Sequence, residues 1–245
     1  MRMIDQDSMT TNMTTALDNT LSSTVDRHFL HRGFGAEFEM EVDWIRAHLP
    51  TDARRILEIG CGGGVLFDAL GTDRVVGLDY AWDGLAHTAA RFPAVPLVCA
   101  SADRVPLRDA FADGIVAQHV LEHLTDGELA CWEWFRVLRP GGTLLILTPN
   151  VAFSDPRVFF DDTHVHLFSG DELASLLGRV GFEVSDMRTL GLNAFREYKG
   201  RPGAWRMRRL VTRWAHALSA MPGLRDRGQT LCCCAVRPDD SSCMF

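Results

Sequence analysis

The feature that most constrains this chain is a glycine-rich stretch between an apolar run and an amphipathic one. The apolar residues Ile56–Ile59 lead into Gly60, and Gly62–Gly64 follow before the segment Val65–Leu70. Glycine tolerates positive φ angles and lets the backbone pass close to a ligand, because it has no Cβ atom. A helix that begins after such a loop offers unpaired N–H groups. We therefore predict a strand, a ligand-binding turn and a helix in this order.

From Arg54 onward, short apolar runs alternate with amphipathic stretches, as is typical of a parallel sheet with helices on both faces. We expect strands at Arg55–Ile59, Arg74–Leu78, Leu97–Ala100, Gly114–Gln118, Thr143–Leu147, Phe182–Arg188 and Leu231–Val236. We expect helices at Glu37–His48, Val65–Leu70, Trp82–Arg91, Gly127–Leu138 and Gly170–Val180. A capping box of Ser169 and Glu172 begins the last helix, and Gly181 ends it. The sequence thus predicts an α/β fold with a doubly wound, Rossmann-like sheet of seven strands.

The composition supports a globular domain and argues against several other classes of protein. Of the 245 residues, 47% are hydrophobic and 23% are charged, which is enough apolar material for a sizeable core. The net charge of −7 argues against a dedicated nucleic-acid binder, which needs a surplus of Lys and Arg. The seven cysteines lack the paired spacing of zinc sites and disulfide frameworks, so we expect reduced, mostly buried thiols.

Shifts in composition suggest how the chain is organised. The N-terminal part lacks the pattern of a signal peptide, and no apolar stretch has the length of a membrane span, so we expect a cytoplasmic protein. We expect a poorly ordered leader at 1–27, a helical segment at 28–53, the main domain at 54–238 with insertions at 150–168 and 192–228, and a tail at 239–245.

An acidic residue follows the second predicted strand. Asp79 lies nineteen residues after Gly60, the spacing at which doubly wound folds place a carboxylate that binds ribose hydroxyls. The ligand is then a nucleoside or a nucleotide. A dinucleotide fingerprint wants its third glycine at Val65, whereas here it stands at Gly64. The carboxylate of Glu58, just before the turn, suits an ammonium or sulfonium group better than a pyrophosphate.

With these residues in place, the chain resembles the class I S-adenosylmethionine-dependent methyltransferases, in particular the small-molecule branch that includes ubiquinone-type enzymes. The resemblance covers about Ile56 to Pro238 and implies that the last strand is antiparallel to the rest. It is carried by six blocks in the family order, namely LEIGCGGG (57–64), VVGLDYA (75–81), SADRVPL (101–107), FADGIVAQHVLEHL (111–124), LRPGGTLLILTPN (138–150) and THVHLFSGDELASLLGRVGFEV (163–184).

The resemblance implies S-adenosylmethionine as the cofactor and S-adenosylhomocysteine as its product. In this family the residues around Glu58 line the methionine part of the cofactor, Asp79 holds the ribose and Tyr80 flanks the adenine. Gln118 and His119 would lie beside the sulfonium and the mouth of the substrate site. The expected cofactor-binding residues are Glu58, Gly60, Cys61, Gly62, Asp79, Tyr80, Ala102, Asp103 and Gln118.

Histidines supply the candidate catalytic residues. A neutral imidazole near pH 7 can take the proton of a hydroxyl acceptor, and His119, His164 and His166 are our candidates. His119–His123 also matches a zinc-binding HxxEH pattern, but that pattern needs one long helix, and a strand is expected just before it. His164 and His166, with the carboxylates of Asp161 and Asp162 beside them, could bind a divalent metal. We rank a general base or a substrate contact above ligation and expect no metal.

Residues 195–228 form a basic segment in an otherwise acidic chain, with nine Lys or Arg and two acids. Their apolar positions fall on one helical stripe, which predicts a basic amphipathic helix. The simplest role for this helix is to cover the edge of the sheet with a solvated charged face. A functional alternative is that it attracts an anionic or carrier-linked substrate, or contacts a membrane surface.

The sequence therefore predicts methyl transfer to a small molecule, with a hydroxyl of a sugar or secondary metabolite favoured as the acceptor. Gln118–Leu121 replaces the proline-rich tetrapeptide of methyltransferases that modify amines of nucleic acids, so we expect no nucleic-acid partner. Two alternatives stay open. One is an NAD-type oxidoreductase or epimerase, and the other is a non-catalytic subunit that binds S-adenosylmethionine for a partner.

Overall fold

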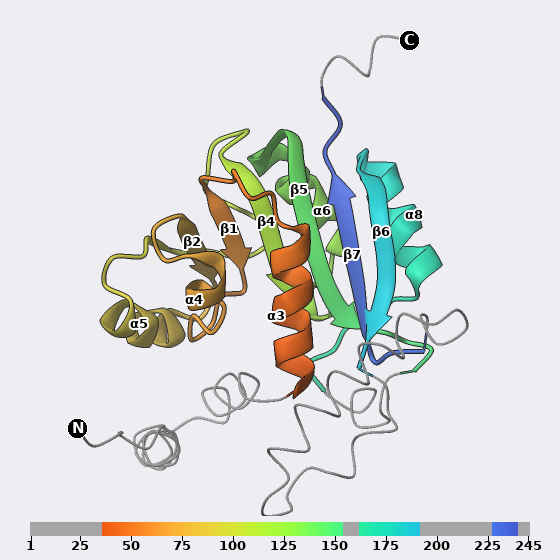
Figure 1. Ribbon diagram of the computed structural model, residues 1–245, viewed down its shortest axis with the longest axis horizontal. Coiled ribbons are helices and arrows are strands. Elements are labelled where there is room, and N and C mark those ends of the chain that lie inside the picture. The colour runs from red at the N-terminus through yellow and green to blue at the C-terminus, as the bar shows by residue number, and fades with distance from the viewer. Residues whose placement is uncertain (1–35, 154–161, 192–226, 240–245) are drawn as a thin grey trace, which may run out of the picture.

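The computed structural model describes residues 36–153, 162–191 and 227–239, which form a twisted sheet with helices on both faces (Figure 1). The predicted leader at 1–27, the basic amphipathic helix and parts of both insertions lie outside the described residues. None of the helices within these ranges combines the length and the apolarity that crossing a membrane requires.

The seven strands lie in the order β3-β2-β1-β4-β5-β7-β6. From β3 to β5 all neighbours pair in parallel, whereas β7 lies between β5 and β6 and is antiparallel to both. This confirms the predicted α/β, doubly wound sheet with an antiparallel last strand. The strands are β1 Ile56–Ile59, β2 Val75–Asp79, β3 Leu97–Cys99, β4 Ala112–Gln118, β5 Leu138–Pro149, β6 Glu183–Leu190 and β7 Thr230–Val236.

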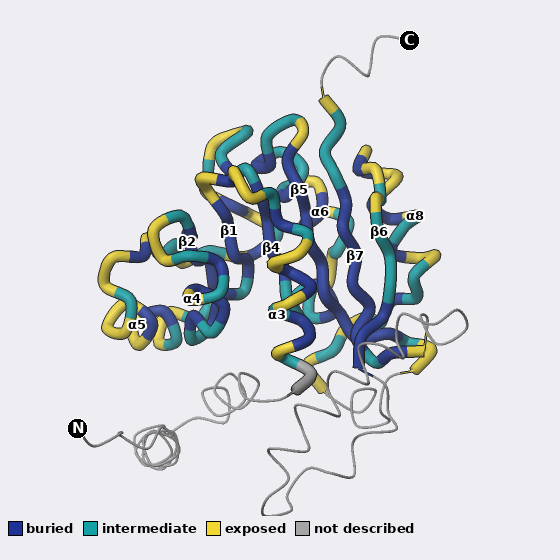
Figure 2. The backbone as a smooth tube through the Cα atoms, in the orientation of Figure 1, coloured by how far each residue is buried: buried dark blue, intermediate teal, exposed yellow. Residues whose placement is uncertain are grey.

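The helices build a separate hydrophobic core on each face of the sheet. Helices α3, α4 and α5 pack on one face, where Trp44 and Phe67 are buried, and α6 and α8 pack on the other, around Trp134. Successive strand residues such as Leu144 and Leu145 contribute to opposite cores, as the pleat of a strand requires. The inner strands are therefore buried between two layers, whereas the edge strands β3 and β6 are partly exposed (Figure 2). The helices are α3 Ala36–His48, α4 Phe67–Leu70, α5 Trp82–Arg91, η2 Leu121–His123 (3₁₀), α6 Gly127–Val137 and α8 Gly170–Val180.

Most element boundaries differ from the prediction by one or two residues, and the differences at α4 and β5 have a structural reason. Helix α4 begins at Phe67 rather than Val65, because the turn of the glycine loop extends to that point. Strand β5 spans Leu138–Pro149 and not only Thr143–Leu147, because β4 pairs with its first residues and β7 with its last. The described cysteines are unpaired thiols and all are buried except Cys99, as expected.

Candidate cofactor and acceptor site

The glycine loop and Asp79 meet at the carboxyl ends of β1 and β2. Gly60, Gly62 and Gly64 have positive φ angles of 71°, 46° and 69°, a region that favours glycine. The N–H of Gly62 donates to Oδ2 of Asp79 at 2.8 Å, and the N–H of Ala81 donates to Oδ1 at 2.9 Å. These bonds hold the loop against β2, so the two features that the sequence links by spacing are in direct contact.

Gly60 also brings the loop close to the end of β4. A Cβ atom at this position would overlap Cγ2 of Val120, which follows β4. The close approach therefore depends on glycine, in addition to the positive φ angle. It places the loop next to Gln118 and His119, the residues at the carboxyl end of β4. Ligands of open α/β sheets bind at this edge.

Glu58 is a buried carboxyl group at the end of β1. Its Oε2 accepts no hydrogen bond from any described residue. Burial raises the pKa of Glu58 well above its ordinary range, and the carboxylate of Asp79 adds to the shift. A buried carboxyl oxygen without a partner is costly, so the site is suited to a ligand that brings a positive charge or a hydrogen-bond donor.

The residues expected around the adenine lie at the ends of β2 and β3. Tyr80 and Trp82 are 73% and 69% exposed, so each presents an aromatic ring to solvent at the end of β2. Ala102 is buried in the loop after β3, and its carbonyl accepts a hydrogen bond from Nε1 of Trp134 at 2.9 Å. Asp103 is the next residue along this loop, and it is partly exposed.

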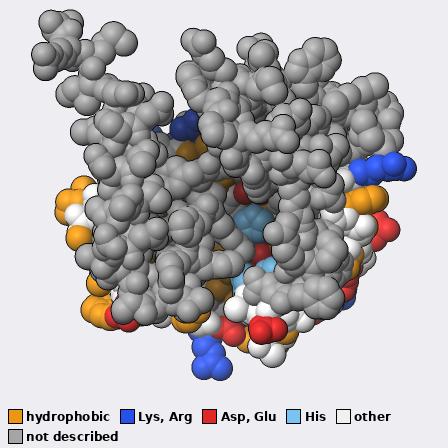
Figure 3. Space-filling model, turned by 90° about the horizontal axis from the view of Figure 1, so that it is seen from below, with side chains coloured by type: hydrophobic (Ala, Val, Ile, Leu, Met, Phe, Trp, Pro, Cys, Tyr) orange, Lys and Arg blue, Asp and Glu red, His pale blue; other side chains and the backbone are white. Residues whose placement is uncertain are grey.

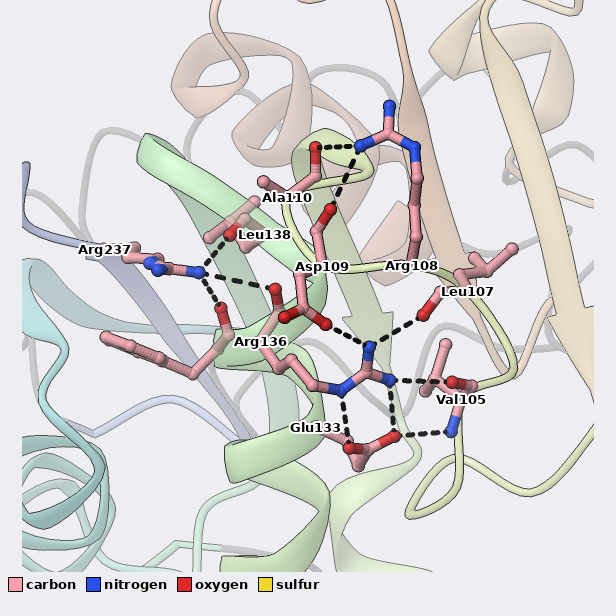
Figure 4. A network of polar contacts seen from close by, with 10 residues as sticks. Val105, Leu107, Arg108, Asp109, Ala110, Glu133, Arg136, Leu138 and Arg237 are labelled. Atoms are coloured by element: carbon pink, nitrogen blue, oxygen red, sulfur yellow. Dashed lines mark hydrogen bonds and ion pairs between the residues drawn. The ribbon is translucent and has the colours of Figure 1, made fainter.

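Arg136 at the end of α6 anchors the remainder of this loop (Figure 4). Its guanidinium donates to the carbonyls of Val105 and Leu107 at 2.9 and 2.8 Å. It also pairs with Asp109 and Glu133, each at 2.8 Å. Helix α6 therefore fixes the position of the segment that carries Ala102 and Asp103.

Glu41 is a site residue that sequence reasoning missed. It lies on α3, is buried, and its Oε2 accepts a hydrogen bond from Nε2 of Gln118 at 2.6 Å. Its Oε1 accepts from Oγ1 of Thr230 at 2.8 Å and lies 3.3 Å from Nε2 of His119. The one available signal was an acid on the apolar face of the predicted helix, next to Met40. Through these contacts α3 joins the carboxyl end of β4.

His119 lies between two buried carboxylates. Its Nε2 faces Glu41, and its Nδ1 lies 3.3 Å from Oε1 of Glu122. Burial alone would lower the pKa of His119, but Glu41 and Glu122 outweigh burial and raise it to about 9. Burial would raise the pKa values of both carboxyl groups, but the pKa of Glu41 is lowered by His119 with Thr230 and Gln118, and that of Glu122 by His119 with His123. Both ring nitrogens are thus engaged by the protein.

The other two candidate histidines have different surroundings. The ring of His164 lies 4.8 Å from the ring of His123, whereas Nε2 of His166 pairs with Oε1 of Glu172 on α8 at 2.7 Å. His166 is exposed and His164 is partly buried. Seen from the carboxyl ends of the strands, histidine and acidic side chains gather near the centre of this face (Figure 3).

Comparisons with known proteins agree with this geometry. Residues 57–146 match a family described as "Methyltransferase domain". The chain is thus similar to S-adenosylmethionine-dependent methyltransferases, and it has the Rossmann-like fold of such a solved structure.

Relatives and solved structures of such methyltransferases resemble the chain over more than half of its length. A methyltransferase of this kind from Mycolicibacterium smegmatis is 42% identical over 156 residues, 62% of this chain and 60% of the relative. The ubiquinone biosynthesis O-methyltransferase of mouse mitochondria is 29% identical over 172 residues, 61% of this chain and 46% of that enzyme. The match therefore spans about half of these relatives. A methyltransferase structure from Thermotoga maritima has a TM-score of 0.62 at 20% identity, covering 87% of this chain and 94% of the other.

The cofactor of these methyltransferases is S-adenosylmethionine, and the site has features that fit it. The buried Glu58 oxygen without a hydrogen-bond partner is suited to a cationic amino-acid portion. The Asp79 oxygens keep lone pairs for ribose hydroxyls beside the two backbone donors.

Proposed function

We propose that this protein transfers the methyl group of S-adenosylmethionine to a hydroxyl of a small molecule. The observation that carries the proposal is the buried Glu58 carboxyl, whose free oxygen lies beside the glycine loop and Asp79. The bound cofactor supplies an electrophilic methyl group on a sulfonium. The similarity to the mouse ubiquinone biosynthesis O-methyltransferase supports oxygen as the acceptor atom, and a sugar or secondary metabolite stays our predicted class of substrate.

The protein's own part in such a transfer is mainly positioning, because the in-line attack needs a close and aligned acceptor. In this proposal Glu58, Gly60, Cys61 and Gly62 hold the amino-acid portion and Asp79 holds the ribose. Tyr80, Ala102 and Asp103 flank the adenine, and Gln118 lies beside the sulfonium. His119 orients the acceptor side of the site rather than accepting a proton, because carboxylates face both of its nitrogens. His164 and His166 stay our candidates for a general base or a substrate contact.

Calorimetric titration of the full chain tests the cofactor assignment. S-adenosylmethionine and S-adenosylhomocysteine should both bind with one site per chain, and NAD should not bind. Glu58→Gln should weaken binding of S-adenosylmethionine about tenfold, the effect of losing one charge-assisted contact. Glu183→Gln is the matched control, because Glu183 is an exposed acid on β6. Binding of NAD in place of both methionine-derived ligands would support the oxidoreductase or epimerase alternative and refute the proposal.

A product assay tests the transfer itself. The protein is incubated with S-adenosylmethionine labelled in its methyl group and a panel of phenolic and sugar hydroxyl acceptors, and labelled products are identified by mass spectrometry. We expect an O-methylated product. If the cofactor binds but no acceptor of any class is methylated, the non-catalytic partner subunit becomes the better explanation.

A further inference from the structure

Three side chains come together next to His119, and the proposed methyl transfer gives a role to only one of them, His164. Glu122 and His123 lie on η2, directly after β4, and His164 lies in the segment that precedes α8. One ligand atom from each residue lies within 4.8 Å of the others. We propose that Glu122, His123 and His164 bind a divalent transition-metal ion.

The buried carboxylate of Glu122 is the centre of this group. Its Oε2 accepts a hydrogen bond from Oγ1 of Thr148 at 3.0 Å, which fixes the carboxylate in place. Its Oε1 is buried and accepts no well-aligned hydrogen bond within the described parts of the chain. The nitrogens near Oε1 are Nδ1 of His119 at 3.3 Å and Nε2 of His123 at 3.9 Å. A cation at Oε1 would satisfy an oxygen that the protein leaves incompletely paired.

The imidazole of His123 is oriented as in metal sites. Its Nδ1 lies 2.9 Å from the carbonyl oxygen of Thr163, so Nδ1–H donates there and Nε2 keeps its lone pair. A backbone carbonyl on the second ring nitrogen is the usual way in which proteins orient a ligating histidine. Nε2 is the nitrogen on the side of Glu122. The tautomer required for ligation is therefore the one that this contact favours.

The segment with His164 is fixed beside Glu122 by the backbone. The N–H groups of Val165 and His166 both donate to the carbonyl oxygen of Glu122, at 2.8 and 3.1 Å. The rings of His123 and His164 lie 4.8 Å apart and are tilted by 49°, so they are not stacked. Two imidazoles from separate parts of the chain are thus held around one carboxylate.

The donor set indicates the kind of ion. Two imidazole nitrogens and one carboxylate oxygen favour Zn²⁺, Mn²⁺, Fe²⁺ or Co²⁺ over Mg²⁺ and Ca²⁺, which prefer oxygen alone. Metal–ligand bonds of about 2.0–2.2 Å would draw the side chains closer by roughly 1 Å. The carboxylates of Glu41 and Glu122 with the imidazolium of His119 leave the surroundings net negative.

Three protein ligands leave a coordination position open, and the side chain of His123 is 30% exposed, so this position can face solvent. An acceptor hydroxyl bound there would become more acidic. This role, but not the binding of the ion, rests on the proposed function. From the sequence we expected no metal, because the HxxEH pattern of His119 and His123 needs one long helix and a strand precedes it. In the structure His123 instead faces His164, which is 41 residues further along the chain.

Calorimetric titration of the untagged full chain, stripped with EDTA, tests the site with Zn²⁺, Co²⁺ and Mg²⁺ separately. We expect one equivalent of Zn²⁺ or Co²⁺ per chain and much weaker Mg²⁺ binding. His123→Gln, His164→Gln and Glu122→Gln should each weaken Zn²⁺ binding at least about tenfold. His166→Gln is the matched control, because His166 lies two residues beyond His164 but pairs with Glu172. This variant should bind Zn²⁺ normally.

Optical absorption of the Co²⁺ form identifies the ligands. Bands from nitrogen and oxygen ligands support the proposal, whereas a sulfur-to-cobalt charge-transfer band would place the ion on a cysteine and overturn it. Unchanged affinity in both His123→Gln and His164→Gln, or the lack of any Zn²⁺ binding, would also overturn it. The titrations contain neither methyl donor nor acceptor. The metal site and the methyl transfer can therefore fail independently.

Discussion

At the scale of single residues, Glu58 should make the stability of the cofactor-free protein depend on pH. Burial holds its pKa above the ordinary value, so the folded protein binds this proton more tightly than the unfolded chain does. Glu58 therefore stabilises the fold fully below the pKa of an unfolded glutamate, and this contribution is lost as the pH rises through the folded pKa. Urea unfolding should show Glu58→Gln to be more stable than the natural chain at pH 8 but not at pH 4. Equal curves at pH 8 would mean that Glu58 is not held protonated.

Glu41 should behave in the opposite way. Burial would raise its pKa, but His119, Thr230 and Gln118 together lower it. The contribution of Glu41 is therefore present above the unfolded pKa and is lost as the pH falls through the folded pKa. Glu41→Gln in EDTA should reduce the free energy of unfolding at pH 7 by about 3 kcal/mol, the cost of breaking a buried ion pair. The difference should narrow below about pH 4, and again above about pH 9, where His119 loses its proton.

The control for this experiment is Glu39→Gln on the same helix. Glu39 is exposed, so its substitution should change the unfolding free energy by less than about 0.5 kcal/mol at every pH. If Glu41→Gln were equally mild, the contacts of Glu41 with Gln118, His119 and Thr230 would not stabilise the fold.

The difference between Glu58 and Glu41 explains which site residues could be predicted. Glu58 and Asp79 stand at the ends of consecutive strands, and parallel strands bring their carboxyl ends to one edge, so spacing along the chain was enough. Glu41 is 77 residues from Gln118, and the fold joins them only through the packing of α3 on the sheet. The pairing of His123 with His164 likewise depends on a loop connection. Contacts of this kind leave no periodic signal in the sequence.

At the scale of elements, α6 holds the loop after β3 through one arginine. Arg136→Gln removes hydrogen bonds to two carbonyls and two carboxylates, and because the donor is charged we expect a loss of about 1.5–3 kcal/mol. The same change should weaken S-adenosylhomocysteine binding, because the loop carries Ala102. The matched control is Arg179→Gln, whose exposed pair with Glu128 should contribute less than about 1 kcal/mol. The anchoring role would be refuted if Arg136→Gln and Arg179→Gln lost the same amount of unfolding free energy and the same affinity for S-adenosylhomocysteine.

Elements were predictable where local chemistry sets their limits. The side chain of Ser169 accepts from the N–H of Glu172, and Gly181 is left-handed with a φ angle of 105°, so α8 begins and ends as its sequence predicts. The length of β5 was not predictable, because Leu138 and Pro149 are extended by pairing with β4 and β7. Sheet ends thus follow from neighbouring strands, whereas helix ends follow from their own residues.

At the scale of the whole molecule, the sheet needs a layer of helices on each face. Helix α3 supplies part of one layer. This helix lies outside the matched methyltransferase domain, which begins at residue 57. Met40, Trp44 and Ile45 of α3 are buried in the same core as α4 and α5. An uncovered sheet face would expose this core to water. The helix is therefore an integral part of the fold, and through Glu41 it also contributes to the site.

Trp44→Ala tests this dependence. The side chain is 4% exposed, so its truncation should lower the free energy of unfolding by about 3–5 kcal/mol in urea titrations. Asp43→Ala, at the adjacent exposed position, should change the unfolding free energy by less than about 0.5 kcal/mol. Because Glu41 lies one turn before Trp44, Trp44→Ala should also weaken binding of S-adenosylhomocysteine at temperatures where the variant is folded. Lower stability with unchanged affinity would mean that α3 only covers the sheet and does not help to form the site.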